Sequence, residues 1–480
     1  MRQRAKAILG MLMLLQFLQC MNLFNRRPFM DEGIYLTSAW MYMQGAIPYV
    51  EFILVKPLGI VWAFAALFSL VEPTIFNARA FMALVSLAQL AMIFLIAKRA
   101  FKSEQAGLAA AFLFVLWNIP FSNYLTANEP FMALFQSIAI LSLYIFLYEK
   151  KSSIALVGFS LSLGISMLFK QTAAIFAVLF AAAFIWLHLR EKKALPSAKE
   201  FGILAAGLAL PGLIMLVHIW QLNAIPEFVE IMLFPIGLAE SASFLVIDSR
   251  ILIALGAFAF VPVALIALWK KSRIAKGSEK ALMLLLLWFL AGFINMFPFR
   301  GCCFHLITAL PAASVIGGFA IAASLEKREN KLLLLFTAAV LALSIIASVS
   351  MQSVLASDTY CFDQIEDVAQ YVKQNTGPEE RILVMPTVPE LYFLSKRQPS
   401  ARQLQFFDEF TPEFQQQILE QVKENRPVMV IYFSQQRQLL YTGPELVDDY
   451  IKENYTEREA IALEPALYKF FNYAIILEPN

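Results

Sequence analysis

The sequence is short of charge, of cysteine and of histidine. Charged residues make up 15% of its 480 residues, and it holds four cysteines and three histidines. Soluble domains are about 25% charged and about 45–50% apolar, whereas this chain is 59% apolar. Four cysteines are too few for a disulfide scaffold, and a net charge of +2 gives no bulk attraction to nucleic acid. The composition argues against a soluble disulfide-bonded protein and against a nucleic-acid partner.

Long apolar runs take the place of the missing charge. They are 17–20 residues long, and short clusters of Lys and Arg separate them. A helix of that length matches the hydrocarbon core of a bilayer, about 30 Å thick, at about 1.5 Å per residue. We therefore expect a polytopic α-helical membrane protein with about 11 transmembrane helices. The expected spans are residues 7–24, 80–97, 106–122, 131–148, 153–169, 172–188, 201–220, 251–269, 281–297, 305–324 and 332–351.

Two apolar segments differ from the other apolar runs. Residues 7–24 resemble a signal peptide, but no small-residue cleavage site follows them, so we expect an uncleaved first helix. Residues 57–71 are interrupted by Gly and are ended by Glu72 and Pro73. We expect them to form an interfacial helix in the first outer loop, because another span there would reverse every later loop.

The Lys and Arg residues are distributed unevenly between the two sides of the membrane. The N-terminus and the loops on its side carry 20 of them, and the opposite loops carry 7. Positive residues are retained in the cytoplasm. We therefore expect a plasma membrane protein, in the inner membrane of a bacterium, with a cytoplasmic N-terminus and an extracytoplasmic C-terminal segment.

The composition changes after about residue 352, where a water-soluble segment begins. Helical periodicity alternates there with short strand-like runs. The expected helices are 362–375, 412–425 and 445–454, and the expected strands are 381–385 and 427–433. This alternation predicts a small C-terminal α/β domain. The chain is thus expected to form a transmembrane domain over 1–351 and an α/β domain over 352–480. The α/β segment contains no histidine, no Gly-rich phosphate loop and no metal-ligand spacing.

An acidic pair, Asp31 and Glu32, follows the first span. The segment Met30–Trp40 reads as an amphipathic helix that lies along the membrane surface. The helix dipole stabilises a carboxylate in the first turn, so one interpretation of Asp31 is a helix cap. The other interpretation is a general base beside a lipid-borne substrate.

Three cationic residues lie where the chain keeps them close to the membrane. Lys56 precedes a proline at which the chain turns back toward the bilayer, Arg79 opens the second span, and Lys170 joins two spans with almost no loop. Such side chains either snorkel to the surface or bind phosphate, for which the arginine fork is well suited.

Three further candidates map to the same expected outer side. Glu129 begins a span within Asn128-Glu129-Pro130, while Arg300 and His305 lie close to the start of another span. A charge near hydrocarbon is costly, so it usually marks a site or a buried pair. A lone histidine is more often structural than a ligand. The candidates all fall on one face of the membrane, as an active site at that face requires.

The order of these motifs is more specific than any single motif. The acidic pair is followed by Gly45-Ala-Ile-Pro48-Tyr49, then by Lys56-Pro57-Leu58, then by Arg79. This order resembles the first outer loop of C-type glycosyltransferases (GT-C), and most of all family 39, the protein mannosyltransferase-like and lipid A aminoarabinose transferase-like enzymes. The resemblance also includes Glu129, Lys170, the stretch from His305 to Pro311, and the outer α/β segment.

The resemblance implies an enzyme that takes a sugar from a polyprenyl-phosphate donor. It would pass that sugar to a lipid, glycan or protein acceptor at the outer face of the membrane. Asp31 would deprotonate the acceptor, and Glu32 would assist by orienting substrate or a metal. The carrier phosphate would be held, and its leaving charge stabilised, by Lys56, Arg79, Lys170 and Arg300. The carrier already activates the sugar, so no nucleotide cofactor is needed.

The resemblance leaves metal dependence open, because relatives differ in their need for a divalent ion. If a metal is bound, Glu32 and His305 are the expected ligands; otherwise His305, like Glu129, is expected to contact substrate. The sequence departs from the family at two points. Lys56-Pro57-Leu58 replaces a frequent lysine and double proline, and Glu51 stands where an Asp is usual.

Two other classes of membrane protein are alternatives. A lipid or solute transporter, or a flippase, usually has ionisable groups at mid-membrane and internal repeats or broken helices, and the sequence shows no clear repeat. A lipid-linked polysaccharide polymerase or ligase would favour a large outer loop late in the chain. The expected partners are membrane lipids, the lipid-linked sugar donor and its acceptor.

Overall fold

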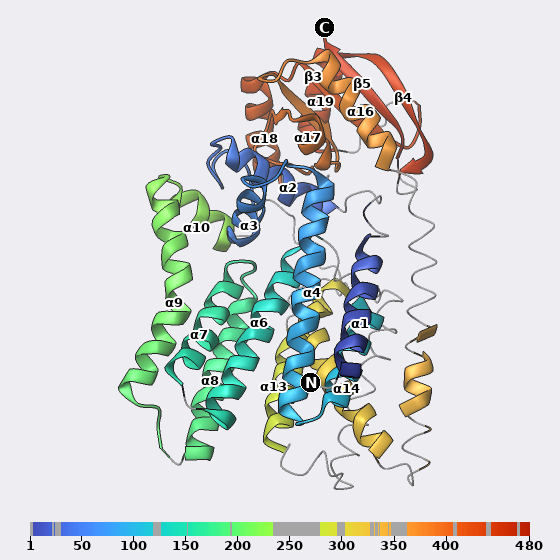
Figure 1. Ribbon diagram of the computed structural model, residues 1–480. Coiled ribbons are helices and arrows are strands. Elements are labelled where there is room, and N and C mark those ends of the chain that lie inside the picture. The colour runs from blue at the N-terminus through green and yellow to red at the C-terminus, as the bar shows by residue number, and fades with distance from the viewer. Residues whose placement is uncertain are drawn as a thin grey trace. The chain divides into compact units, whose positions relative to one another are not determined.

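The computed structural model describes most of the chain, in two compact units (Figure 1). The described residues are 3–21, 24, 30–118, 126–150, 152–192, 194–233, 279–294, 303–326, 331, 335, 337–343, 345–346, 362–406, 410–437, 443–467 and 471–480. The first unit consists of Met1–Leu23, Arg79–Met215 and Ser243–Val354, and the second of Phe24–Ala78, Leu216–Ala242 and Leu355–Asn480. The domain boundary expected near residue 352 lies outside the described residues.

The first unit is built from helices. Within the described residues, five helices are long and apolar enough to cross a membrane. They are α1 (Gln3–Met21), α4 (Ile75–Ala100), α6 (Asn128–Tyr144) with its continuation η1 (Ile145–Glu149), α8 (Ala173–Lys192) and α9 (Ala198–Gln221). Shorter helices accompany them: α5 (Glu104–Asn118), α7 (Ser153–Met167), α13 (Glu279–Ile294), η2 (Cys303–Thr308) and α14 (Leu310–Glu326). The first turn of α4 and the last turns of α9 belong to the second unit.

These helices bear out the expectation of a multi-pass membrane protein. Each expected span that lies largely on described residues coincides with a helix. The expected span 251–269 lies outside the described residues, and only short pieces of 332–351 are described. The number of about 11 spans therefore stays a prediction.

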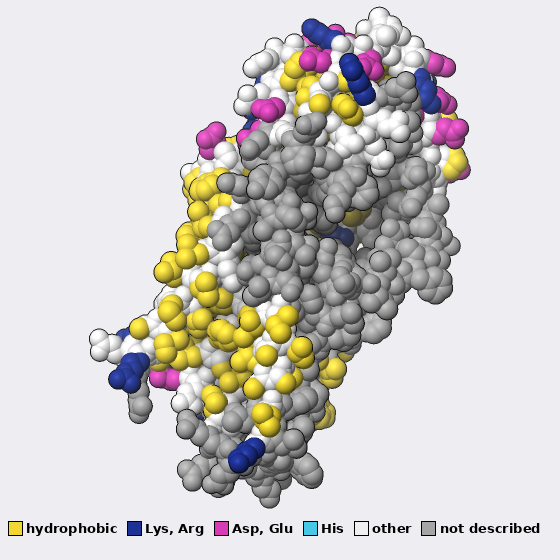
Figure 2. All heavy atoms as spheres, turned by 90° about the vertical axis from the view of Figure 1, so that its right-hand side faces the viewer, with side chains coloured by type: hydrophobic (Ala, Val, Ile, Leu, Met, Phe, Trp, Pro, Cys, Tyr) yellow, Lys and Arg dark blue, Asp and Glu magenta, His cyan; other side chains and the backbone are white. Residues whose placement is uncertain are grey.

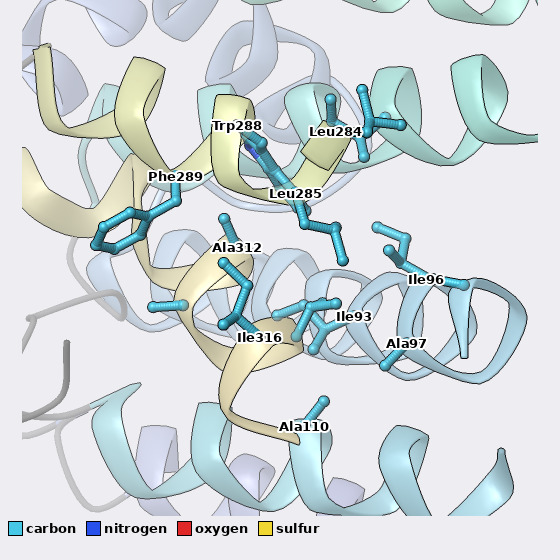
Figure 3. Packing of buried hydrophobic residues seen from close by; sticks show 14 of the residues in the cluster. Ile93, Ile96, Ala97, Ala110, Leu284, Leu285, Trp288, Phe289, Ala312 and Ile316 are labelled. Carbon is cyan, nitrogen blue, oxygen red and sulfur yellow. The ribbon is translucent and has the colours of Figure 1, made fainter. Parts of the chain in front are cut away.

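Branched and small side chains pack the helices of the first unit together. Ile93 of α4, Leu285 of α13 and Ile316 of α14 are buried in one cluster (Figure 3). Helix α14 approaches α5 at Gly318, where a Cβ would lie 2.5 Å from the backbone nitrogen of Ala110. Lipid is as apolar as these side chains, so close packing at small residues holds such helices together.

Helices α7 and α9 also pack closely at glycine residues. A Cβ on Gly164 of α7 would lie 2.5 Å from the carbonyl oxygen of Gly207 on α9, and a Cβ on Gly207 would collide with the Ser160 hydroxyl. That hydroxyl donates a hydrogen bond to the carbonyl of Ile203 at 3.2 Å. The two helices therefore meet backbone to backbone.

The second unit begins with the loop after α1. This loop contains α2 (Met30–Met43) and α3 (Gly59–Phe68), and α10 (Ile225–Leu233) follows α9. The 10 residues of α3 give a helix of about 15 Å, which is half of the hydrocarbon core. Helix α3 is therefore too short to cross, which favours the interfacial interpretation of residues 57–71.

The C-terminal part of the second unit is an α/β domain. Its elements are α16 (Phe362–Asn375), β1 (Arg381–Met385), α17 (Glu390–Ser395), β2 (Gln398–Pro399), α18 (Pro412–Asn425), β3 (Met429–Ser434), α19 (Glu445–Asn454), β4 (Tyr455–Leu467) and β5 (Phe471–Pro479). The sheet order is β2-β1-β3-β5-β4. Strand β1 is parallel to β2 and β3, while β5 is antiparallel to β3 and β4. Every residue of the central strand β3 is buried, as expected for a strand covered on both faces.

Local signals explain where the helices of this domain begin and end. Helix α18 starts after Thr411, whose hydroxyl accepts a hydrogen bond from the backbone of Phe414, and Pro412 occupies its first turn. The guanidinium of Arg397 donates to the carbonyls of Lys373 and Thr376 at 3.2 and 2.6 Å. These bonds satisfy carbonyls at the end of α16 that would otherwise lack partners.

The α/β domain and the helices of the first unit differ in the side chains that they expose. On the face shown in Figure 2, Lys, Arg, Asp and Glu gather over the α/β domain, whereas the described helical surface is mainly hydrophobic. Leu84, Ile154 and Val178 of the first unit are all exposed. Such a surface is suited to lipid rather than to water.

Candidate active site

Asp31 and Glu32 lie in the first turn of α2. Asp31 is half-buried, and Glu32 is 2% exposed. The first turn of a helix stabilises negative charge, because backbone N–H groups point toward it. A carboxylate at such a position is suited to the role of a general base.

Helix α2 packs on the start of α17 in the α/β domain. A Cβ on Gly33 would lie 2.7 Å from the backbone nitrogen of Glu390 and 2.9 Å from its carboxylate Oε2. Glycine permits this approach because it has no side chain. One turn further along, Thr37 Oγ1 donates to the carbonyl of Pro389 at 2.9 Å. The α/β domain therefore holds the helix that carries Asp31.

A buried tyrosine holds the turn that carries Lys56. The Tyr49 hydroxyl donates to the carbonyl of Lys56 at 3.0 Å, and burial raises the pKa of Tyr49, so the phenol stays a neutral donor. The backbone nitrogen of Ile53 donates to the carbonyl of Arg402 at 2.8 Å. The backbone at Lys56 is fixed in this way, while its side chain is partly exposed.

Lys396 fastens the end of the same loop. Its Nζ donates to the carbonyl of Pro73 at 2.9 Å and lies 3.6 Å from the centre of the Phe393 ring. Phe393 in turn stacks on Phe68 of α3, with ring centres 5.7 Å apart. Burial lowers the pKa of Lys396 to about 7. Sequence reasoning missed this residue, because Lys396 resembles any other surface lysine in an amphipathic segment.

An aromatic group around His218 was also missed. His218 Nε2 and the Tyr42 hydroxyl are hydrogen-bonded at 3.0 Å, and the Trp62 ring lies 5.6 Å from the His218 ring. These contacts join α2, α3 and the C-terminal end of α9. The three residues are far apart in the sequence, and no local pattern connects them.

In the first unit, Arg79 lies near the start of α4 and is 7% exposed. Two residues further along, the Phe81 ring lies 5.8 Å from the ring of Phe131 on α6. The starts of α4 and α6 are therefore neighbours.

Glu129 and Lys170 form a buried ion pair. The pair joins the start of α6 to the turn between α7 and α8, and its side chains are 5% and 3% exposed. The rings of Phe131 and Phe169 stack beside it, with centres 4.8 Å apart. Removal of one partner from such a pair costs about 3–5 kcal/mol, because the other charge is left buried. The two candidates meet in the structure, and their charges cancel.

The side chains of the last two sequence candidates, Arg300 and His305, are not among the described ones. Arg300 lies outside the described residues, and of His305 only the backbone is described, within η2. Helix η2 packs against α6, which carries Glu129 at its start.

A metal site does not emerge from the described residues. Among them, no group of three or more His, Cys, Asp or Glu side chains could hold a metal ion.

Comparison with known proteins identifies the class of the fold. Residues 55–220 match the sequence family described as dolichyl-phosphate-mannose-protein mannosyltransferase; no curated protein sequence matches the chain. The matched segment includes Lys56, Arg79, Glu129 and Lys170, and Asp31 precedes it. Solved structures share the fold over nearly the whole chain. The chain has the fold of the C-type glycosyltransferases and resembles their family 39, which confirms the fold class and the resemblance drawn from the sequence.

The solved structures that are similar to this chain include a bacterial enzyme and an archaeal enzyme. The chain is 13% identical to ArnT from Cupriavidus metallidurans bound to undecaprenyl phosphate, with a TM-score of 0.63 over 98% of this chain and 97% of ArnT. It is 11% identical to the apo oligosaccharyltransferase of Archaeoglobus fulgidus, with a TM-score of 0.58 over 90% of this chain and 70% of that one. The archaeal enzyme AglB, in complex with an inhibitory peptide and a dolichol-phosphate, gives 12% identity and a TM-score of 0.57 over 98% and 74%.

Proposed function

We propose that this protein is a glycosyltransferase that uses a polyprenyl-phosphate-linked sugar as donor. The observation that carries the proposal is the shared fold, which covers 98% of this chain and 97% of ArnT, a protein solved with undecaprenyl phosphate. The acceptor would be a lipid, glycan or protein. The comparisons lend no support to a transporter, a flippase or a polysaccharide polymerase.

Transfer of the sugar requires a base for the acceptor and positive charge for the leaving phosphate. We assign the base to Asp31, which lies in the first turn of α2, where backbone N–H groups stabilise negative charge. Attack of the acceptor oxygen or nitrogen on the anomeric carbon breaks the bond to the carrier phosphate, and Asp31 takes the acceptor proton. Glu32, buried beside it, orients substrate.

We assign the stabilisation of the leaving phosphate to cationic side chains. Lys56, on the turn held by Tyr49, and Arg79 are the proposed first contacts, together with Arg300. A fixed positive charge stabilises the negative charge that develops as the phosphate leaves. Lys170 is paired with Glu129, so we propose that the two act on the donor as one neutral polar group. His305 remains a proposed substrate contact.

The proposed orientation in the membrane rests on the distribution of Lys and Arg and not on the fold. The excess of Lys and Arg on the N-terminal side, 20 against 7, supports a cytoplasmic N-terminus and an extracytoplasmic α/β domain. The proposed reaction then takes place at the outer face of the plasma membrane, the inner membrane of a bacterium.

We further propose that Glu32 and His305 are the ligands of a divalent ion. A related solved structure, the Archaeoglobus fulgidus oligosaccharyltransferase, is described in complex with Zn and sulfate. Transfer that persists in EDTA would remove a metal from the proposal and leave the base and the cations in place.

The test follows sugar release from undecaprenyl-phosphate donors by the purified full chain in lipid, with a membrane extract as acceptor. We expect Asp31→Asn to lower transfer about 10²–10⁴-fold, the usual contribution of a general base. Glu72→Gln is the matched control, because it replaces an exposed carboxylate of the same loop and should leave transfer unchanged. Equal loss in both variants would point to a damaged loop, and unchanged transfer in Asp31→Asn would remove Asp31 as the base.

A further inference from the structure

Two buried polar side chains in the first unit have atoms with no hydrogen-bond partner among the described residues. Neither the oxygen nor the nitrogen of the Asn128 amide is bonded, and the Thr172 hydroxyl is not bonded either. Asn128 is 0% exposed and Thr172 is 9% exposed. Buried polar atoms are nearly always paired, because an unpaired one loses its bonds to water without replacement. An arrangement of this kind is unfavourable unless something else supplies the bonds.

Asn128 and Thr172 lie on the two segments that the Glu129–Lys170 ion pair joins. Glu129, next to Asn128, pairs with Lys170, two residues before Thr172. The stack of Phe131 on Phe169 also joins these two segments. The start of α6 and the turn before α8 thus carry buried polar side chains next to a stacked aromatic pair.

A structural role for the Asn128 amide is not supported by its surroundings. Asparagine near a helix start commonly caps the helix with its side chain. Here the N-cap of α6 is Ala127, and no side chain caps it. The amide of Asn128 therefore does none of the work that asparagine usually performs at this position.

The chemistry of the group indicates what it would bind. The charges of Glu129 and Lys170 compensate each other, so the group offers no net attraction to a second phosphate. An amide presents two donors and an acceptor, and a hydroxyl presents one donor and accepts as well. Neighbouring hydroxyls of a sugar ring form hydrogen bonds with such neutral donors and acceptors. Hydrogen bonds from these hydroxyls to a carboxylate or an ammonium group are stronger still.

We propose that Asn128 and Thr172, with the Glu129–Lys170 pair, bind the hydroxyls of the donor sugar, here taken as a hexose. This inference rests on the proposed function and extends it, because it separates recognition of the sugar from recognition of the carrier phosphate. Asn128 and Thr172 are then specificity residues, and neither takes part in bond breaking.

The test compares thermal stabilisation of the purified full chain by two kinds of ligand. One is bare undecaprenyl phosphate, and the other is undecaprenyl phosphate that carries mannose, glucose or galactose. We expect the native chain to bind at least one hexose-bearing carrier about tenfold more tightly than the bare carrier. Asn128→Leu and Thr172→Val should abolish that difference and leave binding of the bare carrier unchanged, whereas Lys56→Met should weaken both.

The stability of the free protein separates this role from a structural one. Asn128→Leu removes polar atoms that have no partner in the described structure, so the unliganded variant should unfold at the same temperature as the native chain or at a higher one. A structural asparagine would give the opposite result, a clear loss of stability, and that loss would overturn the proposal. Ser137→Ala is the control on the same helix, because the Ser137 hydroxyl already bonds to the carbonyl of Ala133; it should keep the preference for the hexose.

The remaining outcomes are distinct. Equal binding of bare and hexose-bearing carriers by the native chain would overturn this inference and leave the proposed function intact. Binding of neither carrier would overturn the proposed function, and the inference would fall with it.

Discussion

Lys396 donates a hydrogen bond to the carbonyl of Pro73, although 323 positions separate the two residues. The contact joins the end of the first loop to the α/β domain. Together with the bonds of Thr37 to Pro389 and of Ile53 to Arg402, it makes the loop and the domain one compact unit. The position of Asp31 therefore depends on residues near the other end of the chain.

The stability of this unit should depend on pH through Lys396. Burial lowers the pKa of Lys396 to about 7 from an ordinary value of 10.5. Between these values the unfolded chain binds more protons than the folded one, so the free energy of unfolding should rise as pH rises from about 7 to 10. Nearby charge contributes less, with Lys373 lowering the pKa and Glu72 raising it. Lys396→Met should flatten this rise, which thermal unfolding of the full chain at several pH values measures. An equal rise in native chain and variant would contradict the assignment.

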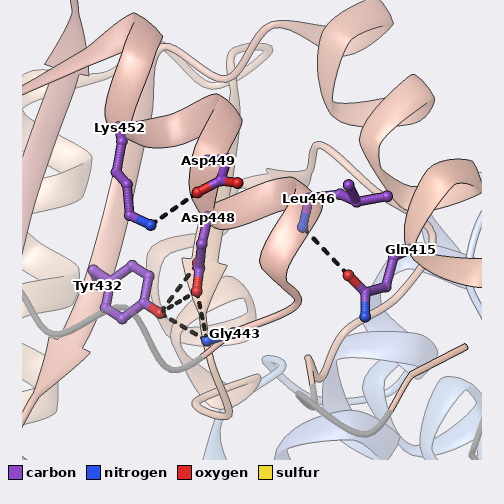
Figure 4. A network of polar contacts seen from close by, with 7 residues as sticks. All are labelled: Gln415, Tyr432, Gly443, Leu446, Asp448, Asp449 and Lys452. Atoms are coloured by element: carbon purple, nitrogen blue, oxygen red, sulfur yellow. Dashed lines mark hydrogen bonds and ion pairs between the residues drawn. The ribbon is translucent and has the colours of Figure 1, made fainter. Parts of the chain in front are cut away.

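Asp448 should give the opposite pH dependence. Its carboxylate is buried and accepts hydrogen bonds from the Tyr432 hydroxyl and the backbone N–H of Gly443 (Figure 4). Burial raises its pKa to about 6 from 3.8. The folded chain then binds more protons between these values, so the free energy of unfolding should fall as pH rises from about 4 to 6. Asp448→Asn should remove this fall, as followed by unfolding of the full chain over that range.

A second substitution tests the hydrogen bonds of Asp448 rather than its charge. Asp448→Ala leaves the N–H of Gly443 and the hydroxyl of Tyr432 without this acceptor, and loss of such partners costs about 1–3 kcal/mol. Hydrogen exchange of the Gly443 amide should quicken in Asp448→Ala more than in Asp448→Asn at pH 7. The same exchange rate in both variants would show that the carboxylate does not hold this turn.

Gly33→Ala should separate α2 from α17. The added Cβ would lie 2.7 Å from the backbone nitrogen of Glu390, a distance at which one of the two helices must move. Because α2 carries Asp31, we expect transfer to fall although no proposed catalytic group has changed. A lower kcat with an unchanged donor KM would be the sign of a displaced base.

Gly212→Ala is the control for Gly33→Ala. Gly212 also lies on a helix, and no atom lies within 4 Å of its added Cβ. This variant should keep native transfer. If both alanines reduce transfer alike, the loss comes from glycine replacement in general and not from the contact with α17.

Gly207→Ala and Gly202→Ala form a matched pair on α9. A Cβ on Gly207 would collide with Ser160 of α7, whereas Gly202 has no atom within 4 Å. We expect Gly207→Ala to lower the unfolding temperature and Gly202→Ala to keep or raise it, since alanine favours a helix by about 1 kcal/mol over glycine. Thermal unfolding in detergent measures both. A smaller loss at Gly207 than at Gly202 would contradict the close packing of α7 on α9.

Much of the α/β domain could be predicted, because its helices are amphipathic. The expected ranges 362–375, 412–425 and 445–454 coincide with α16, α18 and α19, where apolar residues recur at helical spacing. Strand β1 also agrees with its expected range. The hairpin β4–β5 was missed. Strand β4 begins at Tyr455, and the next four residues, Thr456-Glu-Arg-Glu459, are polar. Such a run has a weak strand propensity, and β4 depends on β5 for its pairing.

The candidate site could be predicted as residue types but not as contacts. The order of charged motifs singled out Asp31, Lys56 and Arg79, because ionisable groups stand out against an apolar background; their roles stay predictions. The pairing of Glu129 with Lys170 was not foreseen. It joins segments 41 positions apart, and only the packing of α6 beside the turn before α8 brings them together.

The assembly of the second unit from distant segments also sets an order of events during synthesis. Thr37 and Pro389 are 352 positions apart, and a ribosome adds about 5–20 residues per second. Helix α2 therefore waits for roughly tens of seconds, already outside the ribosome, before α17 exists. A chain that ends before α17 leaves the Asp31 segment without the hydrogen bond of Thr37 to Pro389.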